Sequence, residues 1–275
     1  MQKLIIDISN WIKEEVGKAG KKGVVLGLSG GLDSTITAFL CKKALGPDKV
    51  LGIIMPCHCR SETPKDTKIA VEFLQITTKQ IDLSSTYDAF LSILPEGNRI
   101  SQANLKVRLR MVTLYYFANI LDYLVVGTGN KSECYAGYFT KYGDGAVDIL
   151  PIADIYKTEL IRLAEYINIP ARIINKPPTA DLWEGQTDEG EMGITYKELD
   201  KALKILLENK KRATTARSVA APPPKRLWRV GDKAMERRAS KSLVRRAGRQ
   251  QEKLVKEMIK NSAHKTALPP IFKLK

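Results

Sequence analysis

Glycine and serine residues near the start of the chain have the types and spacing that a polyphosphate-binding loop requires. Residues 24–28 (VVLGL) read as a buried strand, residues 29–34 (SGGLDS) as a tight turn, and residues 35–44 as a helix that begins near Asp33. Glycine lets backbone amides approach an anion closely, and a helix N-terminus favours negative charge. Because the Asp33 carboxylate would repel phosphates unless a cation lay between them, the pattern predicts a bridging Mg²⁺ ion.

This loop lacks the Gly-Lys-Ser/Thr ending of a Walker A motif, which argues against a kinase or GTPase of the usual kind. The sequence SGGLDS instead resembles the pyrophosphate-binding loop of the N-type ATP pyrophosphatases. Those enzymes split ATP into AMP and pyrophosphate to adenylate a substrate oxygen, and a nucleophile then displaces AMP. The alternative is a glycine turn without a ligand. The match of six residues in order after a buried strand favours the ATP loop.

Two further loops carry groups that suit a nucleotide site. Residues 127–129 (Gly-Thr-Gly) would let amides and a hydroxyl face a nucleotide, and Glu133 could supply a second carboxylate for Mg²⁺. Capping of a helix N-terminus is the alternative for Glu133. Residues 138–145 (YFTKYGDG) form a glycine-rich aromatic loop with one lysine. Lys157 begins the next helical stretch, where a solvated lysine is the alternative.

Strands that alternate with helices must position these loops. The expected strands are residues 24–28, 50–55, 79–82 and 123–127, and the expected helices include residues 66–74, 84–94, 102–121, 157–166 and 196–208. This alternation predicts an α/β fold: a doubly wound, Rossmann-like parallel sheet with helices on both faces. Ligands bind such sheets at the carboxyl ends of the strands, so the loops after the first, second and fourth strands should lie together. Residues 176–195 show no period and read as an acidic lid or a solvated loop.

Composition limits the class of protein. The chain has 275 residues, no stretch apolar enough to span a membrane and no apparent signal peptide. Its four cysteines form no disulfide framework, which favours a reducing, cytoplasmic location. Residues 57–59 (Cys-His-Cys) lack the second ligand cluster that a structural zinc site needs. Residues 210–256 hold 16 Lys and Arg but 3 Asp and Glu, so most of the net charge of +15 belongs to one segment.

Seven motifs occur in the order seen in ammonia-dependent NAD synthetases, which this chain resembles. The motifs are GLSGGLDS, KVRLRM, GTGNKSE, FTKYGDG, DILPIADIYK, KPPTADL and SAHK. The resemblance covers residues 4–208 and resumes near residues 251–274. It implies an enzyme that converts nicotinic acid adenine dinucleotide (deamido-NAD), ATP and ammonia into NAD, AMP and pyrophosphate with Mg²⁺. It also implies a homodimer whose dinucleotide site lies at the subunit interface.

The resemblance assigns roles one position at a time. It places Gly27, Leu28, Ser29, Gly30, Gly31, Leu32, Asp33, Ser34, Thr128, Lys157 and Thr179 at ATP-binding positions. Asp33 and Glu133 fall on the magnesium carboxylates, and together with Lys157 they are the catalytic candidates. Arg108, Lys141, Asp148, His264 and Lys265 fall on positions that bind deamido-NAD. Thr266 departs from the family, which often has Arg there, and this weakens the C-terminal assignment.

The glycine loop begins at residue 27, which leaves no room before it for a glutaminase. We therefore expect a single NAD synthetase domain over residues 1–275, supplied with free ammonia or with ammonia from a separate protein. Residues 210–250 do not resemble the family and are expected to be a mobile connector, with a helix from about Lys233 to Lys260.

Two alternatives belong to other classes. The basic segment could bind RNA in a tRNA-modifying enzyme, or the chain could be a non-catalytic binding protein. Paired CxxC motifs typical of the tRNA thiolases are absent, and aromatic residues are too sparse in the segment for a stacking platform. Nucleic acid and membranes are therefore not expected partners.

Overall fold

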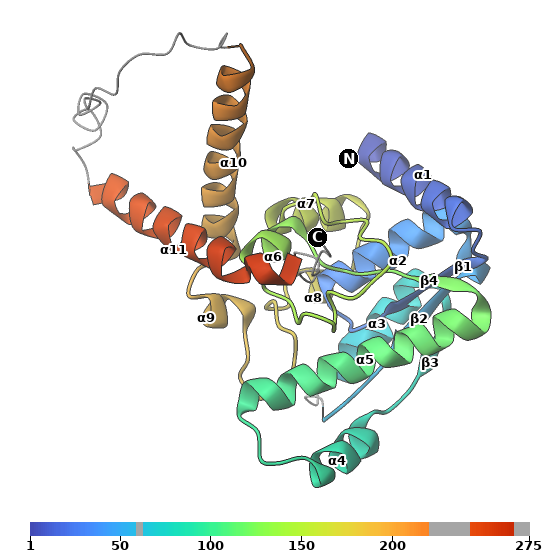
Figure 1. Cartoon of the computed structure of the whole chain (residues 1–275). Helices are drawn as coiled ribbons and strands as arrows, with labels where there is room; N and C mark the ends of the chain where they lie inside the picture. Colours follow the sequence, from blue (N-terminus) through green and yellow to red (C-terminus); the bar gives the residue numbers. More distant parts are fainter. Residues whose placement is uncertain (59–62, 220–242, 267–275) are drawn as a thin grey trace, which may run out of the picture. The chain divides into compact units, whose positions relative to one another are not determined.

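The computed structural model describes residues 1–58, 63–219 and 243–266 (Figure 1). The chain divides into two compact units, of which the first comprises Met1–Cys134 and Tyr138–Gly193. The second comprises Tyr135–Gly137 and Ile194–Lys275. Within the described ranges, no helix combines the length and the apolar character needed to cross a membrane. The expectation of a single domain over the whole chain stays a prediction.

The first unit is built on a sheet of four strands, all of them parallel, as predicted. The strands are β1 (Gly23–Gly27), β2 (Val50–Ile54), β3 (Thr77–Gln80) and β4 (Tyr123–Val125), in the spatial order β3-β2-β1-β4. Val24 of β1 pairs with Val50 on one side and with Leu124 on the other. The strand order reverses beside β1, so the loop that follows β1 lies at the topological switch point, where such sheets bind ligands.

The helices of the first unit surround the sheet. They are α1 (Gln2–Lys18), α2 (Leu32–Leu45), α3 (Thr63–Leu74), α4 (Ser84–Ile93), α5 (Arg99–Leu121), α7 (Lys157–Tyr166), α8 (Ala171–Ile174) and α9 (Asp188–Met192), with a short 3-10 turn at Pro47–Lys49. Of these, α2, α3, α4 and α5 connect the successive strands of the sheet. Helix α6 (Lys131–Ala136) begins in the first unit and ends in the second.

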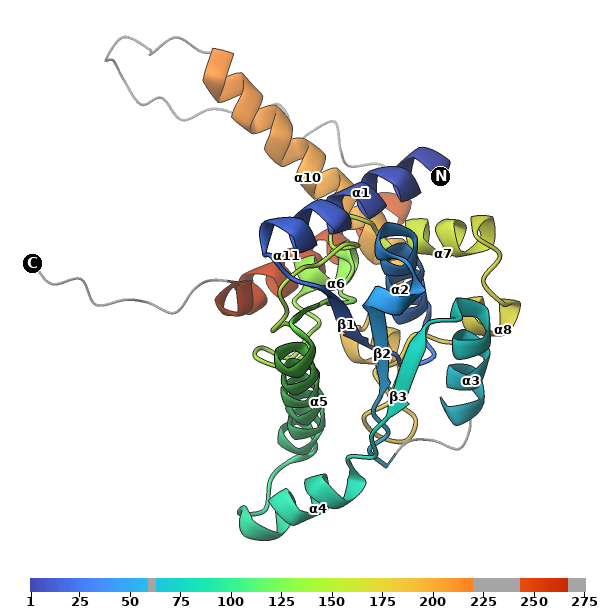
Figure 2. The same ribbon diagram turned by 90° about the vertical axis from the view of Figure 1, so that its right-hand side faces the viewer.

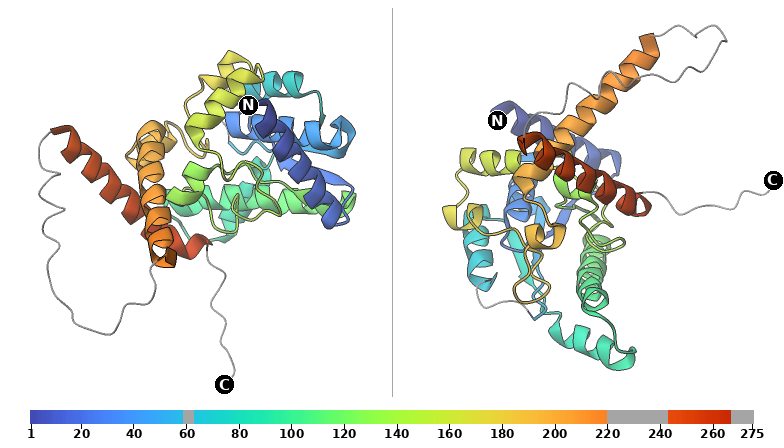
Figure 3. Two further views of the ribbon diagram at one scale, coloured as in Figure 1. Left: turned by 90° about the horizontal axis from the view of Figure 1, so that it is seen from above. Right: turned by 90° about the vertical axis from the view of Figure 1, so that its left-hand side faces the viewer.

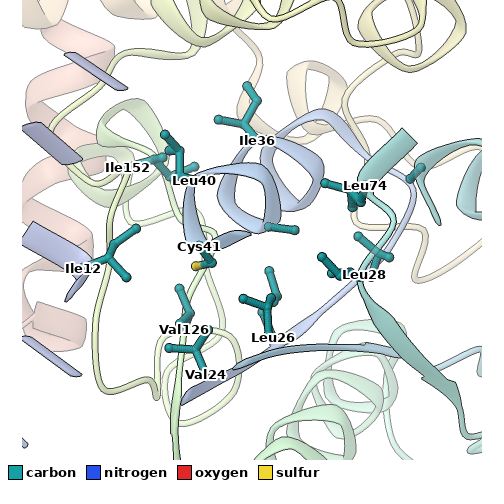
Figure 4. Close-up of a cluster of buried hydrophobic side chains, with 14 of the residues drawn as sticks. Ile12, Val24, Leu26, Leu28, Ile36, Leu40, Cys41, Leu74, Val126 and Ile152 are labelled. Carbon is teal, nitrogen blue, oxygen red and sulfur yellow. The ribbon is translucent and has the colours of Figure 1, made fainter. Parts of the chain in front are cut away.

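Alternate residues of β1 point to opposite faces of the sheet, and each face has its own hydrophobic core. Val24 and Leu26 pack with side chains of α1, α2 and α3, among them Ile12, Leu40 and Leu74 (Figure 4). The same cluster includes residues of α7 and α8. Val25 packs instead with Leu51 and Ile53 of β2 and with residues of α4 and α5. Figure 2 shows the sheet between α3 on one side and α5 on the other. The doubly wound arrangement with helices on both faces is therefore confirmed.

Several element boundaries differ from the predictions. The third strand is Thr77–Gln80, two residues before the predicted 79–82, because register with β2 and not local composition places it. Helix α5 begins at Arg99 and not at 102, since the Asn98 side chain caps it by accepting from the Ser101 amide. Helix α9 lies inside the stretch 176–195, where no regular structure was expected.

The second unit contains α10 (Tyr196–Val219) and α11 (Leu243–Thr266), which pack against each other (Figure 3). Gln251 Nε2 donates to Glu198 Oε1 over 2.6 Å, and Leu199, Leu203 and Val255 are buried. Helix α10 continues beyond the predicted end at 208. The described start of α11 is Leu243, ten residues after the helix start predicted at Lys233. Most of the basic connector, residues 220–242, lies outside the described residues, so that prediction stays open.

Candidate active site

The glycine loop turns back on itself before α2 and is held by its own hydroxyl groups. Ser34 Oγ donates to Gly31 O over 3.1 Å and lies 3.1 Å from Ser29 Oγ, which accepts from the Gly31 amide over 3.2 Å. Gly30 has φ +71°, and a Cβ there would lie 2.6 Å from Thr67 N, so glycine is required at this position. The loop therefore places its backbone and the N-terminus of α2 where an anion can bind.

Asp33, in the first turn of α2, meets Lys157 at the start of α7. Lys157 Nζ donates to Asp33 Oδ2 over 2.6 Å, and Asn130 Nδ2 donates to the same oxygen over 3.2 Å. The Lys157 and Asp33 side chains are 7% and 14% exposed. Among the described residues, Asp33 Oδ1 is buried without a hydrogen-bond partner. A buried carboxylate oxygen without a partner is costly, which indicates that a cation or another ligand belongs there.

Glu133 caps α6 and also lies beside Lys157, so the capping alternative is confirmed and the magnesium role stays a prediction. Its Oε2 accepts from the Asn130 amide over 3.1 Å, and Asn130 Oδ1 accepts from the Glu133 amide over 3.0 Å, which completes a capping box for α6. Its Oε1 lies 3.9 Å from Lys157 Nζ. Two of the three loops predicted to lie together, those after β1 and β4, therefore meet at the carboxyl end of the sheet. The loop after β2 runs into residues 59–62, which lie outside the described residues, so its part of the prediction stays open.

The electrostatics of this cluster are those of a crowded, dry site. Burial, followed by the negative charge of Asp33, raises the pKa of Glu133 to about 8. Burial would lower the pKa of Lys157, but the charges of Asp33 and Glu133 outweigh it and raise that pKa. Lys157 is therefore a protonated ammonium, and the solvated alternative for this lysine is wrong.

A second polar cluster, formed by Tyr138, Gln186, Asp188 and Glu191, was not indicated by the sequence. The Tyr138 hydroxyl donates to a carboxylate oxygen of Glu191, which also accepts from Gln186 Nε2, and it lies 3.1 Å from Asp188 Oδ1. Asp188 is 5% exposed, and its charge helps to raise the pKa of both Glu133 and Lys157. The sequence contains an acidic run at residues 188–191 and an aromatic loop at residues 138–145, but no sequence pattern indicates that the two contact each other.

The residues expected to bind deamido-NAD fall into two groups. Arg108 of α5 donates from Nη2 to the Lys141 carbonyl over 3.3 Å, so helix and aromatic loop are joined there. Asp148 is occupied on both oxygens, because it accepts from the Val125 amide over 2.7 Å and from the Tyr115 hydroxyl over 3.1 Å. In the second unit, Lys265 donates to the Gly137 carbonyl over 2.6 Å. The His264 side chain lies outside the described residues.

The remaining ATP candidates flank the cluster in sequence. Thr128 is half-buried between the end of β4 and the start of α6. Thr179 Oγ1 accepts from the Asp181 amide over 3.0 Å, in a turn where Asp181 has φ +52°. The ATP-binding roles of these two residues stay predictions.

A parallel sheet with a glycine loop at its switch point, two buried carboxylates and a buried lysine defines an α/β protein built to bind a nucleotide. The family model described as NAD synthase matches residues 4–237, and the chain belongs to this family. It is 49% identical over 214 residues to the NH(3)-dependent NAD(+) synthetase of Archaeoglobus fulgidus, covering 77% of this chain and 86% of that one. It is 49% identical over 217 residues to the enzyme of the same name from Methanocaldococcus jannaschii, covering 76% and 83%.

Solved structures agree with this assignment. The NMN synthetase of Francisella tularensis aligns with a TM-score of 0.76 at 32% identity, over 98% of each chain. The NH3-dependent NAD synthetase of Campylobacter jejuni aligns with a TM-score of 0.74 at 28% identity, over 99% of this chain and 98% of that one. The prediction of an NAD synthetase is confirmed, and the tRNA-modifying alternative is not favoured.

Proposed function

We propose that this chain catalyses the amidation of deamido-NAD by ammonia at the expense of ATP, giving NAD, AMP and pyrophosphate. The observation that carries the proposal is the meeting of Asp33, Glu133 and Lys157 beside the glycine loop, in a member of the NAD synthase family. The direct test is incubation with ATP, Mg²⁺, deamido-NAD and ammonium, followed by chromatographic detection of NAD and AMP.

The chemistry requires activation of a carboxylate. Ammonia cannot displace oxide from the nicotinate carboxylate, so the carboxylate oxygen first attacks the α-phosphorus of ATP and pyrophosphate leaves. Ammonia then attacks the carbonyl carbon of the acyl adenylate, AMP leaves with the bonding electrons, and the nitrogen loses its extra proton. The enzyme needs no covalent nucleophile, since both steps are direct displacements. Its task is to orient the reactants and to stabilise the charge that develops on phosphate oxygens.

The residues of the site suit that task. Backbone amides of the glycine loop and the N-terminus of α2 bind the β- and γ-phosphates, which leave as pyrophosphate. Lys157 is protonated and buried, so its ammonium can neutralise charge on the phosphates in a medium of low dielectric. Arg108 and Lys141 supply positive charge for the anionic dinucleotide.

The carboxylates fit a magnesium ion bound together with the nucleotide. The described residues hold no cluster of three His, Cys, Asp or Glu side chains that would bind a metal by themselves. Mg²⁺ is usually held by one or two carboxylates, with phosphates and water completing its ligands. Asp33, with its unpartnered Oδ1, and Glu133 would supply those carboxylates. The ion would neutralise phosphate charge as pyrophosphate departs.

A mononucleotide substrate is the second candidate, because the Francisella tularensis structure carries the name NMN synthetase. The same chemistry on the deamido form of nicotinamide mononucleotide would give that product. A competition assay with equal concentrations of deamido-NAD and the deamido mononucleotide decides between them. We expect deamido-NAD to be preferred, since the curated relatives at 44–49% identity are NAD synthetases.

We also propose that the chain works as a homodimer. Helix α5 exposes Val112, Tyr116 and Ile120 at intervals of four residues, and these side chains are 58%, 64% and 60% exposed. Such a stripe on one face of a helix is the pattern of a surface that another chain covers. Sedimentation equilibrium of the Tyr116→Lys variant tests this, and a wild-type chain that sediments as a monomer at micromolar concentration would contradict it.

A cytoplasmic location is the last part of the proposal. Cys41 and Cys134 are free thiols, which fits a reducing compartment. Fractionation of the source cells, with detection of the protein by antibody, tests this.

A further inference from the structure

Asp66 is a buried carboxylate that belongs to none of the sequence motifs. It lies on α3 and is 4% exposed. Arg172 Nε donates to Asp66 Oδ1 over 2.7 Å, and Lys176 Nζ donates to Oδ2 over 2.9 Å. Burial opposes ionisation of Asp66, but the hydrogen bonds and charges of Lys176 and Arg172 prevail and lower its pKa. Asp66 is therefore an anion held between two cations from a different part of the chain.

The backbone beside Asp66 is in contact with the glycine loop. A Cβ added to Gly30 would lie 2.6 Å from Thr67 N and 2.8 Å from the Asp66 carbonyl carbon. The loop and this turn of α3 therefore touch through backbone atoms, which cannot move aside as a flexible side chain can. A shift of α3 at Asp66 would change the surface against which Gly30 rests.

Lys176, one of the two cations that pair with Asp66, lies in the loop that contains Thr179. Lys176 precedes Thr179 by three residues. The same loop is tied at two later points, where Asp188 N donates to Pro178 O over 3.0 Å and Lys106 Nζ donates to Leu182 O over 3.0 Å. Of these three ties, the one at Lys176 joins the Thr179 loop to the turn of α3 that touches Gly30.

We propose that Asp66 is a positioning residue for ATP, which fixes the glycine loop relative to the Thr179 loop through the backbone at Gly30 and the ion pair with Lys176. The inference rests on the proposed function, in which both loops contact ATP. The triad of Asp66, Arg172 and Lys176 adds little to the free energy of unfolding, because the cost of removing its charges from water offsets much of their Coulombic attraction. Its two directional, charge-assisted hydrogen bonds nevertheless hold two elements in one arrangement.

The test compares Asp66→Asn with a matched control, Asp122→Asn. Asp122 also pairs with two cations, since it accepts from Lys21 Nζ over 2.8 Å and lies 3.7 Å from Lys22 Nζ, but it precedes β4 at the opposite end of the sheet. Its φ of +59° suits asparagine equally well. The readouts are the Kd for MgATP by titration calorimetry and the KM values for ATP and for deamido-NAD.

We expect Asp66→Asn to raise the Kd and KM for ATP roughly tenfold or more, with the deamido-NAD KM changed less than about twofold. Asp122→Asn should leave both KM values unchanged. A folded Asp66→Asn protein that binds MgATP as tightly as the wild type would overturn the proposal. Equal increases in both KM values would also overturn it, since they indicate a general loss of structure.

A second variant keeps the proposal testable if Asp66→Asn does not fold. Lys176→Met retains the Asp66–Arg172 pair and removes only the tie to the Thr179 loop, so it should weaken MgATP binding by a similar factor. In the Asp66→Asn/Lys176→Met double variant the two losses of MgATP affinity should not add, because both substitutions remove the same contact, the Asp66–Lys176 ion pair. Unchanged binding in Lys176→Met overturns the proposal. The proposed function fails separately, if wild-type protein binds MgATP but makes no NAD from deamido-NAD and ammonium.

Discussion

Lys157 Nζ lies 2.6 Å from Asp33 Oδ2, although 124 positions separate the two residues in the sequence. The same ammonium lies 3.9 Å from Glu133 Oε1, so one buried cation serves two buried carboxylates. With both acids ionised, the cluster carries a net negative charge in a site that water barely reaches. Such a site gains stability from a bound cation or from a proton on one of the carboxylates.

Asp33→Asn and Glu133→Gln should each lower kcat/KM for ATP by about 100-fold or more, because under the proposed function each removes a charge that would hold the magnesium ion against the phosphates. Glutamine can complete the capping box of α6 as glutamate does, so the loss in Glu133→Gln reports charge and not helix capping. Glu159→Gln makes the same change in the capping box of α7 and serves as the control. Steady-state NAD formation at several Mg²⁺ concentrations measures the effect. Wild-type activity in either variant would remove that residue from the site.

Stability should depend on pH through Glu133 when Mg²⁺ is absent. The folded pKa of Glu133, about 8, lies above its ordinary value of 4.5, so between these values the folded state binds more protons than the unfolded state. The contribution is complete below about pH 4.5 and is lost as the pH rises to about 8. The slope is at most about 1.4 kcal/mol per pH unit. Chemical denaturation at pH 5 to 8 should therefore show falling stability, and Glu133→Gln should flatten the curve. A wild-type curve that rises with pH over this range contradicts the assignment.

Arg108→Ala and Lys141→Ala should raise the KM for deamido-NAD about tenfold, with little change in the KM for ATP. Arg108 contacts the Lys141 carbonyl on the exposed face of α5, apart from the Asp33 cluster. Initial rates with each substrate varied in turn measure both constants. Arg162→Ala, on the surface of α7, removes an arginine without affecting either loop and is the control. An unchanged deamido-NAD KM in both variants would refute their placement at the dinucleotide site.

The glycine loop, its strand and the sheet could be predicted because local sequence determines them. Residues 24–26 are apolar and buried in succession, and a glycine at φ +71° follows them. Asp33 and Glu133 could each be proposed as magnesium ligands from their own loops, but only the resemblance joined them with Lys157 in one site, since no local pattern connects positions so far apart. Their shared burial and the capping box at Asn130 required the structure.

Other parts of the site gave no sequence signal. A single aspartate in a helix, such as Asp66, looks like any solvated acid until Arg172 and Lys176 are found against it. Lys106 looks like a surface lysine, yet it is 8% exposed and bonded to the Leu182 carbonyl. The strand β3 was misplaced by two residues because its exposed residues, TTKQ, carry no hydrophobic pattern. Tertiary contacts decide each of these features, and sequence spacing does not record them.

The nitrogen source should be ammonium. The proposed chemistry needs only ammonia at the carbonyl carbon of the acyl adenylate. With deamido-NAD, ATP and Mg²⁺ in excess, ammonium should support NAD formation with a rate that rises with pH as more free ammonia is present. Glutamine freed of ammonia should give less than about one hundredth of that rate, a loss of roughly 3 kcal/mol in transition-state stabilisation. Efficient turnover with purified glutamine would sink the prediction.

Replacement of residues 212–249 by a Gly/Ser linker should leave NAD synthesis within about threefold of the wild type. This change removes 12 Lys and Arg but only 2 Asp and Glu, and none of the matched motifs. It retains the contacts that join the start of α10 to the later part of α11, including the Glu198–Gln251 hydrogen bond and buried Val255. The linker must be long enough to keep residues 251–266 in reach of α10.

The same variant tests what the basic segment binds. A wild-type chain should bind polyanions weakly, with an affinity that falls steeply as salt rises, and the variant should lose most of that binding. Filter binding with heparin and with unrelated RNA sequences at 50 and 200 mM salt measures both effects. A folded variant that cannot make NAD would place the segment in the active site or in the dimer interface. Tight, sequence-selective RNA binding by the wild-type chain, lost in the variant, would instead revive a nucleic-acid role, because weak electrostatic attraction does not discriminate between sequences.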